Sequence, residues 1–264
     1  MKPAGDAGAP PRMTVGADGV ATITLQRPRH LNRLHAEDLA ALQSHFEALR
    51  GSADARALVL TGEGRAFCAG YHLGELGDPA RRDADDAGPQ AFERTVDALE
   101  SLPLPSVARL NGSVYGGATD LALACDFRVG VTGMELRMPA ARLGLHYYPG
   151  GLRRFVERLG PGAAKRLFLL GEAVDDRVLQ ATGYLDLLVG ADELDAAVAS
   201  IVRALAAGAP LALRGMKASI DELAGGRADP QALRQRVAAC AASDDLREGL
   251  AAFAERRAPR FTGH

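Results

Sequence analysis

Two glycine-rich segments contain the residues whose types and spacing could do chemistry. The first, from Gly62 to Leu73, reads GEGRAFCAGYHL, and the second, from Asn111 to Asp126, reads NGSVYGGATDLALACD. Three glycines after a strand could indicate a dinucleotide site, but Phe67 occupies the position where that fingerprint requires its third glycine. The Gly-Ser-Val order of the second segment also differs from the G-x-S-x-G turn of a serine hydrolase. Neither standard motif explains these segments.

Each segment instead combines a tight glycine turn with a preceding strand, an arrangement that can present backbone N–H groups. The first turn centres on Gly70, and the second centres on Gly116 and Gly117 at the start of an apolar helix. A helix N-terminus adds positive potential, because its first N–H groups have no partner inside the helix. Two such turns that meet form an oxyanion hole, which stabilises negative charge developing on a carbonyl oxygen.

The elements that must position these turns follow from hydrophobic patterning. Strands are predicted at residues 20–25, 57–60, 106–110 and 127–131. Helices are predicted between them at residues 36–49, 92–102 and 117–125. A strand, a helix and a second strand in this order imply a parallel pair joined by a right-handed crossover. The chain is therefore predicted to have an α/β fold.

Beyond residue 192 the pattern changes, because three amphipathic helices are predicted at 194–206, 211–223 and 230–242 with no strand between them. A domain boundary is therefore expected near residue 200. Glycine and proline in the first twelve residues replace the apolar core of a signal peptide and predict a disordered lead-in. The expected division is a lead-in over 1–12, a core over 13–200 and a helical region over 201–264. The polar segment from Gly74 to Gln90 predicts a mobile surface loop.

Composition excludes several classes of function. Hydrophobic residues make up 47% and charged residues 24%, which is typical of soluble globular proteins. The formal charge of -2 provides no positive field for nucleic acid, and no apolar stretch approaches the roughly 20 residues that a membrane helix needs. Cys68, Cys125 and Cys240 are too widely spaced for a disulfide framework or a metal-binding pair. We therefore expect a cytoplasmic protein with no metal, nucleic-acid or membrane partner.

Five runs of sequence together resemble the crotonase superfamily, the enoyl-CoA hydratase/isomerase family. In chain order they read ITLQRPRHLNRL, VLTGEGRAFCAGYHL, NGSVYGGATDLALACDFRV, MPAARLGLHYYPGGLRRF and REGLAAFAERRAPRF. The resemblance covers residues 14–262 and implies a crotonase-like spiral of ββα units with a C-terminal helical oligomerisation region. It further implies a homotrimer or homohexamer that acts on an acyl-CoA thioester without another cofactor.

The resemblance also implies roles for particular residues. The backbone amides of Tyr71 and Gly117 would hold the thioester carbonyl and stabilise an enolate, and one such donor is typically worth about 3 kcal/mol in the transition state. Arg33 would meet a CoA phosphate, and Arg256 would contact the CoA of a neighbouring subunit. The residues expected to border the acyl-CoA are Arg33, Leu34, Ala69, Gly70, His72, Leu73, Gly116 and Arg256.

Two positions depart from the pattern of the family's hydratases. Those enzymes carry one glutamate three residues after the second oxyanion glycine and another after the proline that here is Pro139. This chain has Asp120 and Ala140 at these positions. Ala140 cannot transfer a proton, and acid-base catalysis needs a proton-transferring group within hydrogen-bond reach. Hydration of an enoyl thioester is therefore expected to be weak or absent.

Tyr147 and Tyr148, together with His146, offer replacement groups for proton transfer. Other branches of the family use an aspartate or a tyrosine in this loop for isomerisation or decarboxylation, and the isomerase-like position falls on Tyr148. Asp120 and the tyrosine pair are predicted to lie on opposite sides of the thioester, an arrangement that favours protonation of an enolate. The alternative for the tyrosines is packing, because such side chains commonly bury an apolar body.

A second hypothesis for the whole chain is a non-catalytic acyl-CoA-binding protein of the same fold, whose acid and base residues have been lost. A third, a hydrolase on the related Clp-protease-like spiral, needs a Ser/His/Asp set that does not occur at matching positions.

Overall fold

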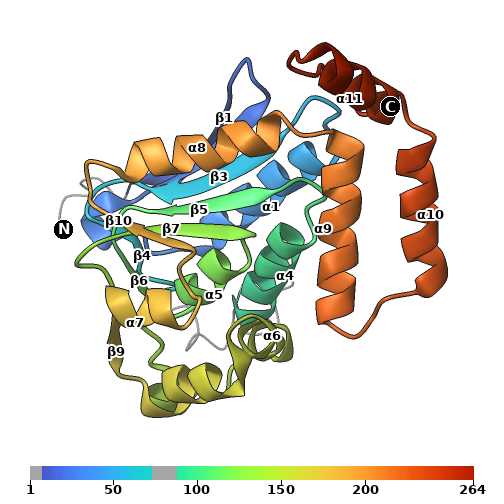
Figure 1. The fold of residues 1–264 in the computed structure, drawn as a ribbon. Helices are drawn as coiled ribbons and strands as arrows, with labels where there is room; N and C mark the ends of the chain where they lie inside the picture. Colours follow the sequence, from blue (N-terminus) through green and yellow to red (C-terminus); the bar gives the residue numbers. More distant parts are fainter. Residues whose placement is uncertain (1–7, 73–87) are drawn as a thin grey trace.

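The computed structural model describes residues 8–72 and 88–264, which form two β-sheets surrounded by helices (Figure 1). The larger sheet has the strand order β1 (Ala9–Val15), β2 (Val20–Gln26), β3 (Ala57–Gly62), β5 (Ser106–Leu110), β7 (Phe127–Val131) and β10 (Leu187–Val189). The smaller sheet has the order β4 (Ala66–Cys68), β6 (Ser113–Tyr115), β8 (Glu135–Arg137) and β9 (Ala173–Asp175). The four strands predicted from the sequence are β2, β3, β5 and β7 of the larger sheet.

The predicted parallel pairing is confirmed, since β2 pairs with β3, β3 with β5 and β5 with β7 in parallel registers. Every residue of β3 is buried, as expected for a central strand covered on both faces. Between β2 and β3 lies α1 (Ala36–Arg50), which buries Leu39, Leu42, Phe46 and Leu49 in the core.

The two sheets are built together as a spiral. Each of β3, β5 and β7 continues after two or three residues into a strand of the smaller sheet: β4, β6 and β8 respectively. The chain then returns to the larger sheet through helices, which are α4 (Gly88–Glu100) before β5 and α5 (Ala118–Leu123) before β7. The result is a repeated ββα unit, in which the smaller-sheet strands end close to the start of a helix.

The segment after β8 is the longest excursion from the larger sheet. It contains η2 (Ala140–Leu143), α6 (Pro149–Lys165), η3 (Arg166–Leu170), β9 and α7 (Asp176–Ala181), and it rejoins the larger sheet at β10. A further short helix, η1 (Pro28–His30), follows β2.

The expectation of a disordered lead-in is wrong for residues 9–12, which belong to β1 and pair antiparallel with β2. Pro10 and Pro11 are compatible with this position, because β1 is an edge strand and its register shifts between Ala9 and Arg12. Residues 1–7 lie outside the described residues. Most of the predicted loop from Gly74 to Gln90 also lies outside them, and its last three residues begin α4.

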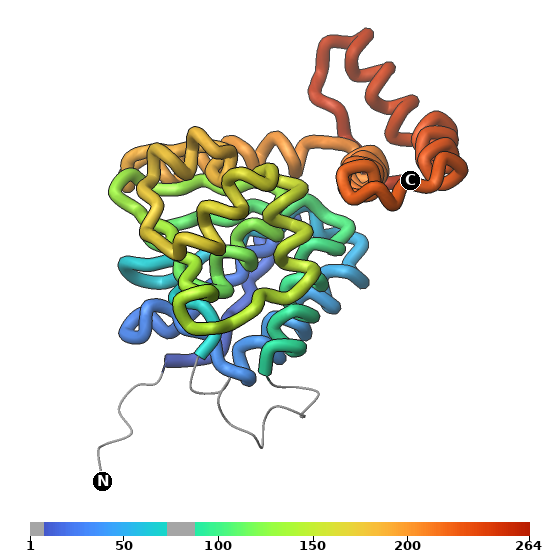
Figure 2. The backbone as a smooth tube through the Cα atoms, turned by 90° about the horizontal axis from the view of Figure 1, so that it is seen from below, coloured from blue at the N-terminus to red at the C-terminus, as the bar shows by residue number. Residues whose placement is uncertain are grey.

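The C-terminal helices divide differently from the expected boundary at residue 200. That residue lies within α8 (Leu194–Ala206), which packs over β3, β5 and β7 (Figure 1). The helices that leave the core are α9 (Pro210–Ala224), α10 (Pro230–Ala241) and α11 (Asp244–Glu255). We call residues 210–264 the C-terminal arm, and Figure 2 shows it projecting from the core.

No single helix in the described part of the chain is long and apolar enough to cross a membrane. Among the described helices, only α8 and α9 taken together reach the required length and apolar composition, and they are bent by 106° relative to each other.

Candidate active site

A cavity of about 210 Å³ lies where three strands of the smaller sheet end. Parallel pairing of β6 with β4 on one side and β8 on the other brings the residues that follow these strands to one edge of the sheet. The cavity is lined from these three strand ends and from α4 and the start of α6, by residues that include Ala69, Tyr71, Phe92, Gly116, Gly117, Met138, Ala140 and Tyr148. We call it the active-site cavity.

The two glycine turns predicted from the sequence meet at this cavity. Gly70 has a φ of +85°, and a Cβ atom there would lie 2.7 Å from the carbonyl oxygen of Tyr115 and 3.0 Å from the amide nitrogen of Gly117. Only glycine accepts this backbone conformation without strain and also leaves room for the second turn. The glycine at position 70 is therefore required for the close approach of the two turns.

The hydrogen bonds of the first turn set the direction of the Tyr71 amide. Leu34 and Tyr71 form a parallel bridge, in which the Leu34 amide donates to Gly70 and the His72 amide donates to Leu34. Successive amides of an extended strand point to opposite sides, so the Tyr71 amide is directed away from Leu34. Tyr71 lines the active-site cavity, as does Gly117 of the second turn.

Gly117 is the N-cap residue of α5, and its amide has no hydrogen-bond acceptor within residues 8–72 and 88–264. A Cβ atom at Gly117 would lie 2.7 Å from the ring of Phe92, so glycine also leaves space for this aromatic wall. The two turns thus meet at a mainly apolar cavity that both Tyr71 and Gly117 line.

The described residues that line this cavity include no carboxylate. Ala140 is 4% exposed at the start of η2 and contributes only a methyl group to the wall. Proton-transferring side chains on the wall are phenols and an imidazole, from Tyr71, Tyr115, His146, Tyr147 and Tyr148. Among the described residues, these five side chains are therefore the candidates for acid-base chemistry at a bound ligand.

Three of these five side chains form hydrogen bonds with groups other than Asp120, the carboxylate predicted to take part in proton transfer. The Tyr71 hydroxyl accepts a hydrogen bond from the Gly88 amide at 3.2 Å. The Tyr115 hydroxyl donates to Glu135 at 3.1 Å. His146 is exposed, and its Nδ1 atom lies 2.8 Å from the backbone oxygen of the next residue.

Asp120 is completely buried behind the cavity wall and does not line it. The hydroxyl of Tyr148 donates a hydrogen bond to Oδ2 of Asp120. The prediction that these two side chains lie on opposite sides of a thioester is therefore wrong. The reason is that α5 packs on α6, and a glycine at position 151 leaves the space, since a Cβ atom there would lie 2.8 Å from Asp120 Oδ2.

Arg154 of α6 is the counter-ion of Asp120, and both side chains are 0% exposed. Its Nη1 atom lies 3.2 Å from Oδ1 and 3.1 Å from Oδ2 of Asp120. Its other nitrogens pair with carboxylates of α4, namely Asp97 at 2.7 Å and Glu100 at 3.1 Å. Burial raises the pKa of Asp120, and the charge of Arg154 opposes that rise. Burial lowers the pKa of Arg154, but the charges of its carboxylate partners together raise it by more, so this guanidinium stays charged.

Tyr147 and Tyr148 lie stacked on each other, with ring centroids 4.4 Å apart. The hydroxyl of Tyr147 is buried and has no hydrogen-bond partner within the described ranges. Burial, followed by the charge of Asp120, raises the pKa of both phenols. A phenolate at either position is strongly disfavoured, so neither tyrosine gives up its proton unless another proton replaces it.

The residues expected to border the acyl-CoA occupy several environments. Ala69 and Gly116 line the active-site cavity, while Gly70 forms the turn beside it. Leu34 has its side chain in the hydrophobic core at 1% exposure, so its backbone bridge to Tyr71 is its contribution to the site. Leu73 lies outside the described residues.

Arg33, His72 and Arg256 do not line the active-site cavity in one chain. The Nε atom of Arg33 is buried and has no hydrogen-bond partner in the described part of the chain. The ring of His72 lies 5.0 Å from that of His35. Arg256 follows α11 near the end of the C-terminal arm, where it is exposed.

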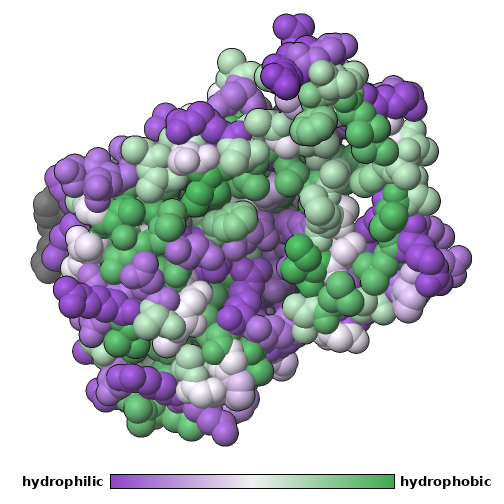
Figure 3. All heavy atoms as spheres, viewed as in Figure 1, coloured by the Kyte–Doolittle hydropathy of each residue, from purple (hydrophilic) through white to green (hydrophobic). Residues whose placement is uncertain are grey.

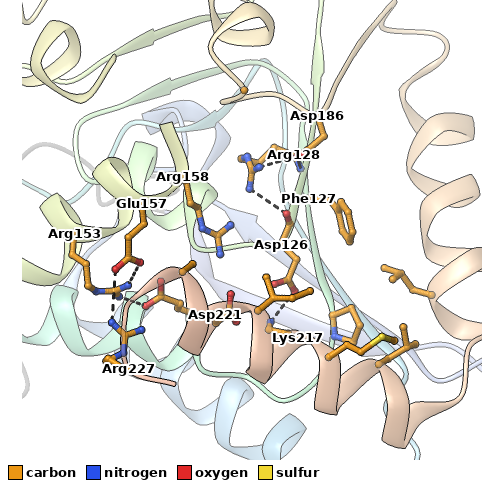
Figure 4. Close-up of a pocket in the computed structure, with 18 residues that line it drawn as sticks. Asp126, Phe127, Arg128, Arg153, Glu157, Arg158, Asp186, Lys217, Asp221 and Arg227 are labelled. Atoms are coloured by element: carbon orange, nitrogen blue, oxygen red, sulfur yellow. Dashed lines mark hydrogen bonds and ion pairs between the residues drawn. The ribbon is translucent and has the colours of Figure 1, made fainter. Parts of the chain in front are cut away.

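A larger cleft of about 550 Å³ lies between the core and α9 (Figure 4). Its walls carry charges of both signs that pair with each other, as Lys217 does with Asp126 at 2.7 Å and Arg227 with Glu157 at 3.8 Å. Neither of the two predicted glycine turns lines this cleft, so the smaller cavity is the candidate active site. No group of three or more His, Cys, Asp or Glu side chains within residues 8–72 and 88–264 could hold a metal ion.

Arg154 was not predicted from the sequence, although it holds Asp120 in place. The available signal is that Arg154 and Phe155 follow Gly151 by three and four residues, because residues three and four apart lie on one face of a helix. Gly151 and Phe155 are both buried, which puts Arg154 on the buried face of α6.

A spiral of ββα units that brings two turn amides to an apolar cavity defines this molecule as a crotonase-fold protein. The family model described as enoyl-CoA hydratase/isomerase matches residues 16–264. The Bacillus subtilis protein YngF, whose name places it among enoyl-CoA hydratases/isomerases, is 33% identical over 95% of this chain and 97% of its own length. The chain therefore belongs to the enoyl-CoA hydratase/isomerase family.

Other relatives agree with this assignment. A crotonyl-CoA hydratase of Syntrophomonas wolfei is 28% identical over 92% of this chain and 94% of its own length. The crystal structure of an enoyl-CoA hydratase from Bacillus anthracis superposes with a TM-score of 0.90 at 29% identity, covering 97% of this chain and 100% of that one. The fold predicted from the sequence is confirmed.

Proposed function

We propose that the protein binds an acyl-CoA thioester with its carbonyl oxygen on the amides of Tyr71 and Gly117 and transforms it through an enolate. The observation that carries this proposal is the meeting of the two glycine turns at an apolar cavity, with the Gly117 nitrogen 3.0 Å from where a Cβ of residue 70 would lie. Negative charge on the thioester oxygen would be stabilised there, at typically about 3 kcal/mol per donor in the transition state.

The cavity wall supports chemistry at the α-carbon better than hydration. Adding water to an enoyl thioester requires a group that activates the water, and Ala140 replaces the carboxylate that hydratases of the family use. Among the described residues, Tyr148 lines the wall and its hydroxyl donates to the buried carboxylate of Asp120, so this pair is a candidate for proton transfer. Isomerisation, decarboxylation or another reaction through an enolate is therefore favoured over hydration.

The test of this proposal is binding, followed by detection of the enolate. Butyryl-CoA at about 100 times its dissociation constant should stabilise the fold by roughly 2.7 kcal/mol, measured as a rise in the melting temperature. Acetoacetyl-CoA, whose enolate absorbs in the near ultraviolet, should show an enhanced enolate band when it binds. Free CoA, which has no thioester carbonyl, is the control. Stabilisation by none of the acyl thioesters would overturn the proposal.

One observation favours a second candidate, a non-catalytic acyl-CoA-binding protein of the same fold. The described wall of the cavity contains no carboxylate, so the site could bind a thioester without turning it over. The two candidates differ in one measurement, the exchange of α-protons of a bound thioester with D₂O. A non-catalytic binding protein should not raise the exchange rate of the α-protons above the rate of the free thioester in solution.

We also propose that the protein assembles as a homotrimer or homohexamer in the cytoplasm. In that assembly Arg33 would meet a phosphate of the CoA within one subunit, and Arg256 would contact the CoA of its neighbour. The exposed apolar residues of the C-terminal arm support the assembly.

A further inference from the structure

We propose that Tyr148 and Asp120 form a two-part proton relay, in which the buried carboxylate exchanges protons with a bound thioester through the hydroxyl of Tyr148. This inference rests on the proposed function, because the relay needs an acyl-CoA whose α-carbon lies beside Tyr148. It assigns Asp120 a role that its burial would otherwise prevent.

The path of the relay follows from which groups reach the cavity. Tyr148 lines the cavity, while Asp120 is 0% exposed and does not. The Tyr148 hydroxyl donates directly to Asp120 Oδ2. Among the side chains that the structure describes, Tyr148 is thus the link between the Asp120 carboxylate and the active-site cavity.

Both ends of the relay are held in place by their neighbours. Arg154 contacts both oxygens of Asp120 at 3.2 and 3.1 Å, which fixes the orientation of the carboxylate. Tyr147 stacks on the ring of Tyr148, and Phe92 meets that ring edge-on at 6.2 Å between centroids. Arg154 is therefore a positioning residue for the relay.

The proposed step moves two protons and leaves Tyr148 neutral throughout. One proton passes from the α-carbon of the thioester to the Tyr148 oxygen, while the proton already on that oxygen passes to Oδ2 of Asp120. The electron pair of the broken C–H bond becomes that of the enolate, whose oxygen is held by the amides of Tyr71 and Gly117. Asp120 ends as a neutral carboxylic acid, and the reverse transfer delivers a proton to the enolate.

The relay avoids the state that a tyrosine acting alone would need. A phenolate at Tyr148 would lie within hydrogen-bond distance of the Asp120 carboxylate, and two like charges at that distance strongly disfavour each other. In the relay the negative charge leaves Asp120 as it appears on the enolate. Burial supports this transfer, because it raises the pKa of Asp120 and makes the carboxylate a better proton acceptor.

The alternative is that the bond between Tyr148 and Asp120 only anchors the start of α6. A structural bond would affect stability but not the chemistry at the α-carbon. The experiment therefore measures the incorporation of deuterium from D₂O into the α-position of butyryl-CoA, by mass spectrometry, together with butyryl-CoA binding. It compares the wild type with Tyr148→Phe, Asp120→Asn and the double variant.

If the relay operates, each single variant should bind butyryl-CoA but lose about 10²- to 10⁴-fold in the exchange rate. The double variant should lose no more than either single variant, because both changes interrupt one path. Tyr184→Phe is the matched control, since Tyr184 is a buried tyrosine whose hydroxyl donates to the backbone of Thr119 at 2.8 Å and which does not line the cavity. Its exchange rate should stay at the wild-type value.

Each other outcome has a defined meaning. If Tyr148→Phe exchanges the α-proton at the wild-type rate, the relay is overturned. This variant keeps the ring contacts with Tyr147 and Phe92, so its result is decisive even if Asp120→Asn does not fold. Losses that multiply in the double variant also overturn the relay, because they show two independent roles. Binding without any exchange by the wild type overturns the relay but leaves acyl-CoA binding standing. Absence of binding overturns the proposed function itself.

Discussion

At the scale of single residues, Arg154 and Asp120 show how a charged pair is kept in the interior. Both side chains are 0% exposed, and their charges are satisfied by each other and by Asp97, Glu100 and Tyr148. Desolvation opposes the burial of both ions, so such a pair contributes little net stability compared with apolar residues. Losing one partner is different, because the remaining charge stays buried without compensation.

Replacing Arg154 with Met should therefore lower the free energy of unfolding by about 3–5 kcal/mol. Urea denaturation followed by circular dichroism measures this change. Asp195→Asn is the control, because Asp195 is 83% exposed in its pair with Arg109, and a surface pair contributes about 0–1 kcal/mol. Equal effects of the two substitutions would show that the buried pair has no special role.

The loss in Arg154→Met should shrink as the pH falls. Burial raises the pKa of Asp120 in the folded protein above the value of 3.8 for a free aspartate. A group with a raised folded pKa favours the folded state at low pH and loses that contribution as the pH rises through the folded pKa. Protonated Asp120 no longer needs Arg154, so the two proteins should converge in stability at acidic pH.

The substitution Ala140→Glu tests the second residue-scale feature, the alanine on the cavity wall. The wild type should hydrate crotonyl-CoA weakly or not at all, and a carboxylate at position 140 should increase the rate by up to about 10²- to 10⁴-fold. Loss of the absorbance of the conjugated thioester measures hydration. Ala141→Glu is the control, since the next residue of η2 is exposed and does not line the cavity. A wild-type turnover of about 10³ per second would show that Ala140 is not the missing group.

At the scale of elements, the site is made by the strands that were hardest to predict. The strands β2, β3, β5 and β7 have five to seven residues with apolar or β-branched patterns, and the sequence predicts all four. The strands β4, β6, β8 and β9 have three residues each, too few for an alternating pattern. Their conformation depends on pairing with each other, which is a tertiary effect.

The glycine turns were nevertheless predictable, because Gly70 and the pair Gly116 and Gly117 are local signals. Their meeting at one cavity was inferred from the turn chemistry and from the family resemblance, and the structure brings them together there. The hydrogen bond between Tyr148 and Asp120 was not predicted from the sequence, because it depends on how α5 packs on α6. The sequence therefore predicts the two turns and the tyrosines that line the cavity, but not Arg154 or the contacts that join Asp120 to Tyr148.

Gly70→Ala tests whether the approach of the two turns makes the binding site. A methyl group would lie 2.7 Å from the Tyr115 carbonyl oxygen and 3.0 Å from the Gly117 nitrogen, so the turns must separate. Butyryl-CoA binding should weaken at least about tenfold, which corresponds to 1.4 kcal/mol. Titration calorimetry measures this change.

The control for that substitution is Gly133→Ala. Gly133 has nearly the same φ, +83° against +85°, but no atom lies within 4 Å of its added Cβ. Both variants therefore carry the same backbone strain, and only one carries the clash. Equal weakening of butyryl-CoA binding in the two variants would exclude the contact between the turns as the cause.

At the scale of the whole molecule, the C-terminal arm has apolar side chains with no core to cover them. The most exposed large apolar residues of its three helices are Ile220 of α9 at 64%, Val237 of α10 at 71%, and Leu250 and Phe253 of α11 at 64% and 86%. Figure 3 shows hydrophobic residues gathered on the arm, separated from the core by a hydrophilic hollow. Extended apolar surfaces of this kind mark contacts with other chains.

We therefore expect light scattering coupled to size exclusion to give a mass of three or six chains. The expected number of subunits comes from the family resemblance. The exposed apolar residues of α9, α10 and α11 are the reason to expect assembly. Phe253→Asp should shift the assembly toward single chains, because each copy replaces a side chain whose burial is worth about 1.5–3 kcal/mol with a charge. Leu187→Asp is the control, since Leu187 is 41% exposed on β10 of the core and lies outside the arm. A wild-type mass of one chain would contradict the prediction, and so would an assembly that Phe253→Asp leaves intact.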